Sequence, residues 1–167
     1  MIKVFIVVAQ TLDGFIAKEV NHPAFWTSKE DKQRFVELTK RAGVVVMGKS
    51  TFKTLPRPLK ERVNIVYSKT EHFEDAETTA DTPIELIQKL EARGFKEVAI
   101  CGGSQIYTMF LKAGVVDTIY ITVEPILFGA GISVFNEPID VQLELKSETK
   151  TESGTIMLEY KVLNKLI

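Results

Sequence analysis

The sequence predicts an α/β protein: a single domain with a mostly parallel central sheet, flanked by helices and extended by antiparallel C-terminal strands. Two observations predict this fold. Up to residue 113, short apolar segments rich in Val and Ile alternate with helical patterns, which is typical of parallel strands buried on both faces. Beyond residue 117, three strand candidates follow one another with no helical pattern between them. The chain length of 167 residues suits one domain over 1–167.

The elements follow from local pattern. Each buried strand is short, apolar and rich in β-branched residues, and we expect them at Lys3–Ala9, Val44–Met47, Val63–Tyr67 and Val98–Cys101. Helical spacing predicts helices at Ser28–Arg41, Pro83–Arg93 and Ser104–Ala113. The last strands are expected at Thr118–Pro125, Gln142–Thr151 and Thr155–Val162, with Ser153-Gly154 as a hairpin turn between the final two.

Composition excludes several function classes. The net charge is −1 and the basic residues are scattered, so no basic stripe points to nucleic acid. No apolar run approaches the roughly 18 residues of a membrane span, and the apolar N-terminus is too short for a secretory signal. Cys101 is the only cysteine, and His22 and His72 are the only histidines, so we expect no disulfide and no metal site. A cytoplasmic location is the expectation.

The segment VAICGGSQIY at residues 98–107 is the most informative in the chain. A buried strand stops at Gly102-Gly103, and a helix begins at Ser104. Adjacent glycines allow a ligand to approach the backbone, and the unpaired N–H groups of a helix N-terminus favour a phosphate. A tight strand–helix turn that binds nothing fits the same residues equally well.

A second strand–glycine–helix junction occurs at Val44–Phe52. Gly48 permits the turn, Lys49 supplies positive charge, and Ser50 and Thr51 supply donors that suit a phosphate ester. The alternative is an ordinary capped turn with a solvated lysine. Because ligands collect at the carboxyl ends of parallel strands, two such junctions together favour a phosphorylated cofactor.

The first helix carries the candidate acid. Asp31, Phe35 and Thr39 are spaced by four residues and therefore share one face. If that face points into a cleft, partial burial raises the pKa of Asp31 and suits it to proton donation. However, Ser28 and Asp31 also have the spacing of a capping box, in which the acid only satisfies a backbone N–H. This segment taken alone favours the capping interpretation.

Three further side chains have two interpretations each. Arg62 follows a Pro-rich bend and suits bidentate binding of a carboxylate, although most arginines are surface cations. Lys69, after Ser68 at the next strand end, is a possible phosphate contact and is equally ambiguous by itself. Trp26 ends a long connection from Gly14 that has the length of a lid or binding loop, but it also fits a core anchor.

Taken together, these residues resemble the dihydrofolate reductase superfamily over nearly the whole chain. The resemblance rests on an ordered series: Asp13-Gly14-x-Ile16-Ala17, Trp26, Asp31 with Phe35 and Thr39, Met47-Gly48-Lys49-x-Thr51-Phe52, Arg62, Gly102-Gly103-Ser104-Gln105-Ile106-Tyr107 and Thr122. It implies an NADPH-dependent oxidoreductase of one-carbon metabolism that reduces 7,8-dihydrofolate to tetrahydrofolate, by hydride transfer to C6 and protonation at N5.

The resemblance also implies a role for each matching residue. Asp31 promotes the protonation, and Trp26 and Thr122 organise this acid. Phe35 packs against the folate, Arg62 binds its glutamate-side carboxylate, and the substrate-binding set is Val7, Val8, Asp31, Phe35, Leu55, Leu59 and Arg62. The NADPH-binding set is Ala9, Ile16, Gly48, Lys49, Ser50, Thr51, Ser68, Lys69, Gly102, Gly103, Ser104, Gln105, Ile106 and Tyr107.

Two segments depart from this pattern. The loop before Trp26 has the unfamiliar sequence Glu19–Pro23, and Glu124–Phe135 is similar to the sister group, the reductase domains of riboflavin biosynthesis. Two alternatives therefore stay open: a reductase of a ribosylamino-pyrimidine phosphate, and a non-catalytic NADPH-binding module. The partners expected are a small-molecule substrate and NADPH, with no nucleic acid and no membrane. A monomer and a homodimer both fit.

Overall fold

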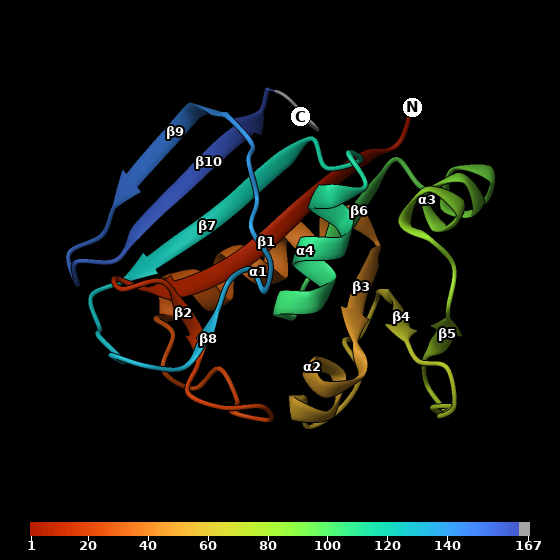
Figure 1. The fold of residues 1–167 in the computed structure, drawn as a ribbon, viewed down its shortest axis with the longest axis horizontal. Coiled ribbons are helices and arrows are strands. Elements are labelled where there is room, and N and C mark those ends of the chain that lie inside the picture. The colour runs from red at the N-terminus through yellow and green to blue at the C-terminus, as the bar shows by residue number, and fades with distance from the viewer. Residues whose placement is uncertain (164–167) are drawn as a thin grey trace.

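The computed structural model describes residues 1–163, which form an eight-stranded sheet with the strand order β5-β4-β3-β6-β1-β7-β10-β9 (Figure 1). The strands are β1 (Lys3–Thr11), β2 (Phe15–Ala17), β3 (Val44–Gly48), β4 (Val63–Tyr67), β5 (Glu77–Thr79), β6 (Glu97–Ile100), β7 (Thr118–Glu124), β8 (Ile132–Ser133), β9 (Leu143–Lys150) and β10 (Ile156–Val162). The helices are α1 (Lys29–Ala42), α2 (Lys49–Thr54), α3 (Pro83–Ala92) and α4 (Ser104–Lys112). β2 and β8 pair in a small separate sheet.

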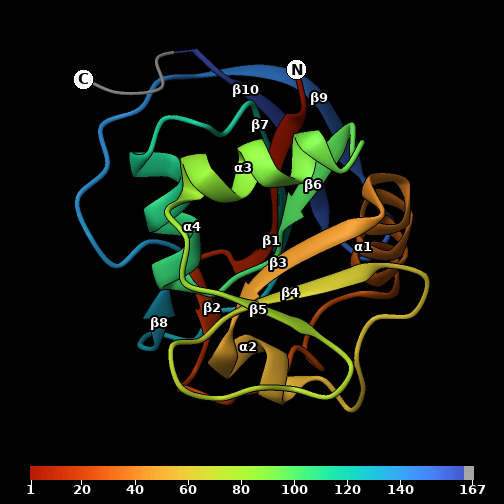
Figure 2. The same cartoon turned by 90° about the vertical axis from the view of Figure 1, so that its right-hand side faces the viewer.

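Helices cover both faces of the sheet. Figure 2 shows α3 and α4 on one side and α1 on the other, with α2 near the lower ends of β3 and β4. The six strands from β5 to β7 in the sheet order run parallel, whereas β10 pairs antiparallel with both of its neighbours, β7 and β9. The carboxyl ends of the parallel strands therefore meet at one edge, where an α/β sheet places its ligands.

The continuous apolar runs are explained by burial on both faces. Along β1, Val4, Ile6 and Val8 belong to the core under α3 and α4, whereas Phe5 and Val7 belong to the core under α1. All five are at most 6% exposed. Alternate side chains of a strand point to opposite faces, so a strand covered on both sides carries no polar positions in its middle.

Local signals set the ends of α1. Ser28 caps the N-terminus, where its Oγ accepts a hydrogen bond from the Asp31 N–H at 3.1 Å. Gly43 ends the helix in the left-handed conformation (φ 76°), and its N–H binds the Thr39 carbonyl. Within residues 1–163 no helix is both long and apolar enough to cross a membrane.

The sheet and helices agree with the predicted α/β class, and most predicted elements shift by only one or two residues at their ends. The strand at 118–124 is a correction, because it pairs in parallel with β1 and only β9 and β10 form the antiparallel extension. The sequence analysis missed β2, β5 and β8, which have two or three residues each and are too short to show a period. That residues 1–167 form one domain stays a prediction, and residues 164–167 lie outside those described.

Candidate active site

A cavity of about 1660 Å³ opens at the carboxyl ends of the parallel strands, between α1, α2 and the N-terminus of α4. It brings together the candidate residues from both halves of the chain. Those that line it are Val7, Val8, Ala9, Ile16, Trp26, Asp31, Phe35, Gly48, Lys49, Ser50, Thr51, Leu55, Leu59, Arg62, Ser68, Lys69, Gly102, Gly103, Ser104, Gln105, Ile106 and Tyr107. Thr122 is not in its wall; it is buried on β7 behind Asp31.

The Asp31 side chain faces this cavity and does not cap the helix. Ser28 caps α1 as predicted, but its own N–H donates to the Glu124 carboxylate at 2.6 Å. The interpretation of Ser28 and Asp31 as a reciprocal capping box, favoured by the segment alone, is therefore wrong in its second half. Since Glu124, 96 positions beyond Ser28, accepts the Ser28 N–H, the Asp31 carboxyl group is not used for capping and faces the cavity.

Burial raises the pKa of the Asp31 carboxyl group above its usual value, and the negative charge of Glu124 raises it further. Hydrogen bonds from Thr122 and Thr27 and the positive charge of Lys32 act in the opposite direction, but burial dominates. The Lys32 ammonium is itself held by the Thr27 hydroxyl at 2.9 Å. A cavity-facing acid whose pKa is raised by burial is better suited than a solvated carboxylate to hold and deliver a proton.

Arg62 is tied to the opposite end of α1. Its Nη1 donates to the Thr39 hydroxyl at 2.8 Å, and its Nε donates to the Lys60 carbonyl at 2.7 Å. Thr39 is fully buried and donates its own hydroxyl hydrogen to the Phe35 carbonyl. No hydrogen bond within residues 1–163 uses Arg62 Nη2, so this edge of the guanidinium remains for a ligand. Arg62 is thus a half-buried, oriented cation, not a free surface one.

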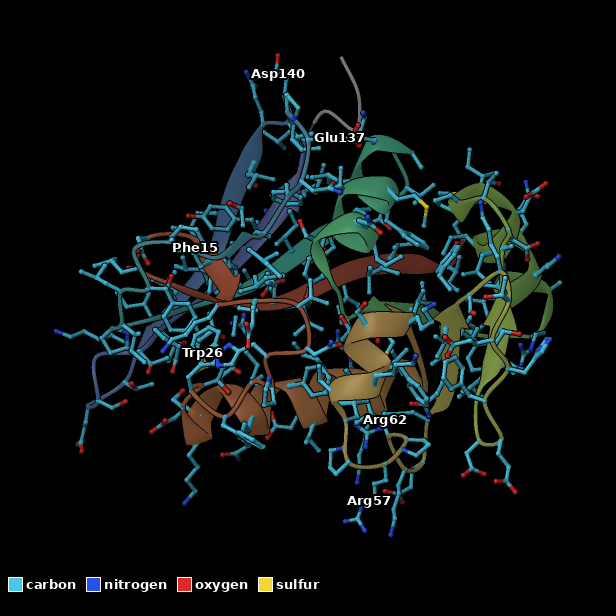
Figure 3. The ribbon with its side chains drawn as sticks, turned by 60° about the horizontal axis from the view of Figure 1, so that its bottom comes forward. Phe15, Trp26, Arg57, Arg62, Glu137 and Asp140 are labelled. Carbon is cyan, nitrogen blue, oxygen red and sulfur yellow. The ribbon has the colours of Figure 1, made fainter. Side chains whose placement is uncertain are left out.

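Trp26 belongs to the wall of the cavity. Its ring packs edge-to-face against Phe128 at a centroid distance of 5.2 Å, which ties the loop before α1 to the loop after β7. Its buried indole N–H has no hydrogen-bond partner within residues 1–163. Figure 3 shows Trp26 and Arg62 toward opposite ends of α1. Trp26 therefore leaves an unpaired, buried donor within the cavity wall and anchors the loop at the same time.

The two glycine junctions meet at the middle of the cavity. The Gly48 N–H donates to the Gly102 carbonyl at 2.8 Å, which joins the end of β3 to the turn after β6. The Gly102-Gly103 peptide bond is cis. A Cβ at Gly103 would lie 3.2 Å from the Thr51 hydroxyl, and one at Gly102 would lie 3.2 Å from the Tyr107 hydroxyl. Only glycine leaves this surface open to a ligand.

The N-terminus of α4 carries unused polar groups. Its N-cap, Gly103, has no side chain to satisfy the first N–H groups. The Ser104 hydroxyl is buried and has no partner among the described residues, although the residue lines the cavity. A buried polar atom without a partner is costly, so a ligand with acceptor oxygens fits here.

The lysine of the other junction is partly neutralised. Lys49 lies 3.3 Å from the Glu71 carboxylate, which also binds Lys53 at 2.9 Å. Glu71 in turn donates its N–H to the Ser68 hydroxyl. These lysines lower the pKa of Glu71. Lys49 is therefore neither simply solvated nor free, and an anion at this edge of the cavity would share it with Glu71.

The sequence analysis missed two groups that shape the acid's surroundings. Thr27 and Lys32 line the cavity beside Asp31, but a Thr and a Lys near a helix start carry no distinctive pattern. Glu124 was noted only within the unusual segment 124–135, although one signal was available. It is the one acid of strand β7 and stands at its carboxyl end, where functional side chains collect.

The comparison with known families agrees with this geometry. The family model for dihydrofolate reductase matches residues 3–154. The chain belongs to the dihydrofolate reductase family. This confirms the resemblance found in the sequence and assigns the chain to a family of oxidoreductases.

Proteins that are similar to this chain carry different names. An uncharacterized protein, YyaP, of Bacillus subtilis is 23% identical over 95% of this chain and 94% of its own length. A putative riboflavin biosynthesis protein from Shewanella has the same fold, with a TM-score of 0.83 and 24% identity over 98% of this chain and 100% of its own. Dihydrofolate reductase from Enterococcus faecalis, solved with NADP(H), gives a TM-score of 0.78 and 25% identity over 97% of both chains.

Proposed function

We propose that this protein reduces dihydrofolate with NADPH. The observation that carries the proposal is the placement of Asp31 and Arg62 at the two ends of one apolar wall. Asp31 lies in the first turn of α1, and Thr39, which holds Arg62, lies about 12 Å further along the helix axis. Phe35, Leu55 and Leu59 line the cavity in between. Dihydrofolate has matching chemistry: a nitrogen-rich ring, an aromatic spacer and a carboxylate tail.

The residues present fit the nicotinamide cofactor. The open glycine turn, the unused N–H groups at the start of α4 and the unpartnered Ser104 hydroxyl suit a pyrophosphate. Lys49 and Lys69 add positive charge at the same rim. When bound, NADPH supplies the hydride. The residues predicted to hold it are those of the two junctions, together with Ala9, Ile16 and Ser68.

The chain's own residues supply orientation and a proton. Arg62 holds the carboxylate tail, and the wall of Phe35, Leu55 and Leu59 excludes water around the spacer, so the ring is placed beside Asp31. The raised pKa favours the protonated form of Asp31, and this proton reaches N5 of the ring through water.

The second candidate is reduction of a ribosylamino-pyrimidine phosphate. The segment 124–135 favours it, and so does the similarity in fold to the Shewanella protein over 98% of this chain and 100% of the other. Such a substrate needs a second phosphate site, for which Lys32 and Arg62 offer cationic groups in the same cavity. The long apolar wall favours the aromatic spacer of folate over a ribose phosphate.

Oxidation of NADPH by the purified protein, with and without dihydrofolate and with methotrexate as competitor, tests the proposal. Oxidation that needs dihydrofolate and is blocked by the antifolate is expected. Turnover of the pyrimidine but not of dihydrofolate would select the second candidate. Binding of NADPH with turnover of neither substrate would indicate a non-catalytic module.

Asp31→Asn tests the role of the acid. We expect its rate at neutral pH to fall about 10²- to 10⁴-fold, because general acid catalysis is lost, while NADPH binding is retained. Glu30→Gln is the matched control, because Glu30 is the adjacent first-turn acid and lines a separate groove outside the cavity. Unchanged turnover in Asp31→Asn would exclude the proposed role.

A further inference from the structure

A buried carboxylate stands next to the candidate acid. Glu124 ends β7 and is only 2% exposed. One of its oxygens accepts the Ser28 N–H at 2.6 Å, and the other accepts the Ser28 hydroxyl at 3.0 Å. Within residues 1–163 it forms no ion pair. Burial of a carboxylate without a cation costs free energy, which indicates a role for Glu124 beyond packing.

Helix α3 of the same chain shows what Glu124 replaces. There the cap is local: the Thr82 hydroxyl accepts the Glu85 N–H, and the Glu85 carboxylate accepts the Thr82 N–H at 2.9 Å. In α1 the first half is conventional, because the Ser28 hydroxyl accepts the Asp31 N–H. In the second half, the Ser28 N–H donates to the carboxylate of Glu124 and not to that of Asp31. Glu124 lies on a strand far away in the sequence.

We infer that Glu124 is a positioning residue for Asp31. By occupying the acceptor position at the N-terminus of α1, it directs the Asp31 carboxyl group into the cavity, and its charge favours the protonated form of that group. The inference deepens the proposed function, since it concerns how the acid of the proposed reaction is kept ready.

The direction of the electrostatic effect follows from the groups around Asp31. The charged and titratable groups that act on it or are acted on by it are Glu124 on β7, Lys32 and Arg34 on α1 and Tyr107 on α4. Burial and Glu124 raise the pKa of Asp31, whereas Lys32 lowers it. Among these groups Glu124 is the anion, so its neutralisation removes the one charge that favours protonated Asp31.

Glu124→Gln separates charge from shape. The amide oxygen still accepts the Ser28 N–H, but the negative charge is gone. The titration of Asp31, followed by NMR of its side-chain carboxyl carbon in the protein without substrate, is expected to move to lower pH. The descending limb of the pH–rate profile should move by the same amount, with the rate above it falling about tenfold for each pH unit of displacement.

Two further variants make the test selective. Glu37→Gln removes a carboxylate from the exposed side of α1 and should leave the Asp31 titration in place. Glu124→Asp keeps the charge but withdraws it from Ser28, so the Asp31 carboxyl group competes for that N–H and its titration also moves to lower pH. If Glu124→Gln does not fold, this second variant carries the test. Asp31→Asn identifies the carbon signal.

The outcomes separate this inference from the proposed function. An unchanged Asp31 titration in the Glu124 variants would overturn the positioning role, whether or not the protein reduces dihydrofolate. A shifted titration in a protein that does not turn over dihydrofolate would support the positioning role and reject the proposed reaction. A loss of rate in Glu124→Gln with no displacement of the pH profile would show only a structural contribution and would also overturn the inference.

Discussion

Gly131 offers the sharpest test of how the cavity rim is built. It directly precedes β8, which pairs with β2, and residues of both strands line the cavity. A Cβ at position 131 would lie 2.3 Å from the Ala17 carbonyl oxygen, and the backbone there has φ +153°. The clash is with main chain, so no side-chain rotation relieves it. Gly131→Ala therefore has to force the two strands apart.

The magnitude follows from two contributions. Restoring ordinary contact with Ala17 needs a separation of about 1 Å, and overpacking of this kind costs about 1–3 kcal/mol. The unfavourable φ adds about 1–2 kcal/mol for an alanine. We expect Gly131→Ala to lower the free energy of unfolding by about 3 kcal/mol. Gly129→Ala is the matched control, since Gly129 also has positive φ but a Cβ at that position would meet no atom within 4 Å, so about 1 kcal/mol is expected.

Urea unfolding followed by circular dichroism measures both variants, with binding of NADPH as a second observable. Because Ile16 on β2 and Ile132 on β8 both line the cavity, NADPH affinity should fall in Gly131→Ala and stay near wild type in Gly129→Ala. Equal losses of stability in the two variants would refute the reasoning, because the steric contribution would then be absent.

Three further predictions concern the cavity itself. Gly103→Ala places a methyl group 3.2 Å from the Thr51 hydroxyl, so NADPH affinity, measured by fluorescence titration, should fall about tenfold with little loss of stability. Thr39→Val removes the hydroxyl that holds Arg62, a hydrogen bond to a charged group worth about 1.5 kcal/mol, so KM for dihydrofolate should rise about tenfold while kcat changes little; an unchanged KM would contradict the tethering role. Asp31→Asn should raise the melting temperature at neutral pH. Because burial raises the pKa of Asp31 in the folded protein, its stabilising contribution is present at low pH and lost as pH rises through the folded value. The stability gain of the variant should therefore disappear in acid.

The periodicity of apolar residues in the sequence predicted most of the fold. The buried strands β1, β3, β4 and β6 are indicated by apolar runs, and the glycine turns mark where they stop. It failed for β2 and β8, whose two or three residues are strands only because Gly131 lets their backbones approach each other. It also failed for the direction of β7, since an isolated strand pattern does not reveal its neighbour or its orientation.

In the candidate site, too, some features follow from the sequence and others from the tertiary structure. The sequence by itself determined the chemical groups: an acid on a helix face, an arginine after a bend, and two glycine junctions that expose backbone N–H groups. Only the tertiary structure decided what each group does. Asp31 faces the cavity because Glu124, 96 residues beyond Ser28, accepts the Ser28 N–H in its place, and Arg62 is oriented because Thr39 on α1 accepts its hydrogen bond. Spacing along a chain specifies local hydrogen bonds, but competition for a donor such as the Ser28 N–H is decided by whichever acceptor the packed sheet brings within reach.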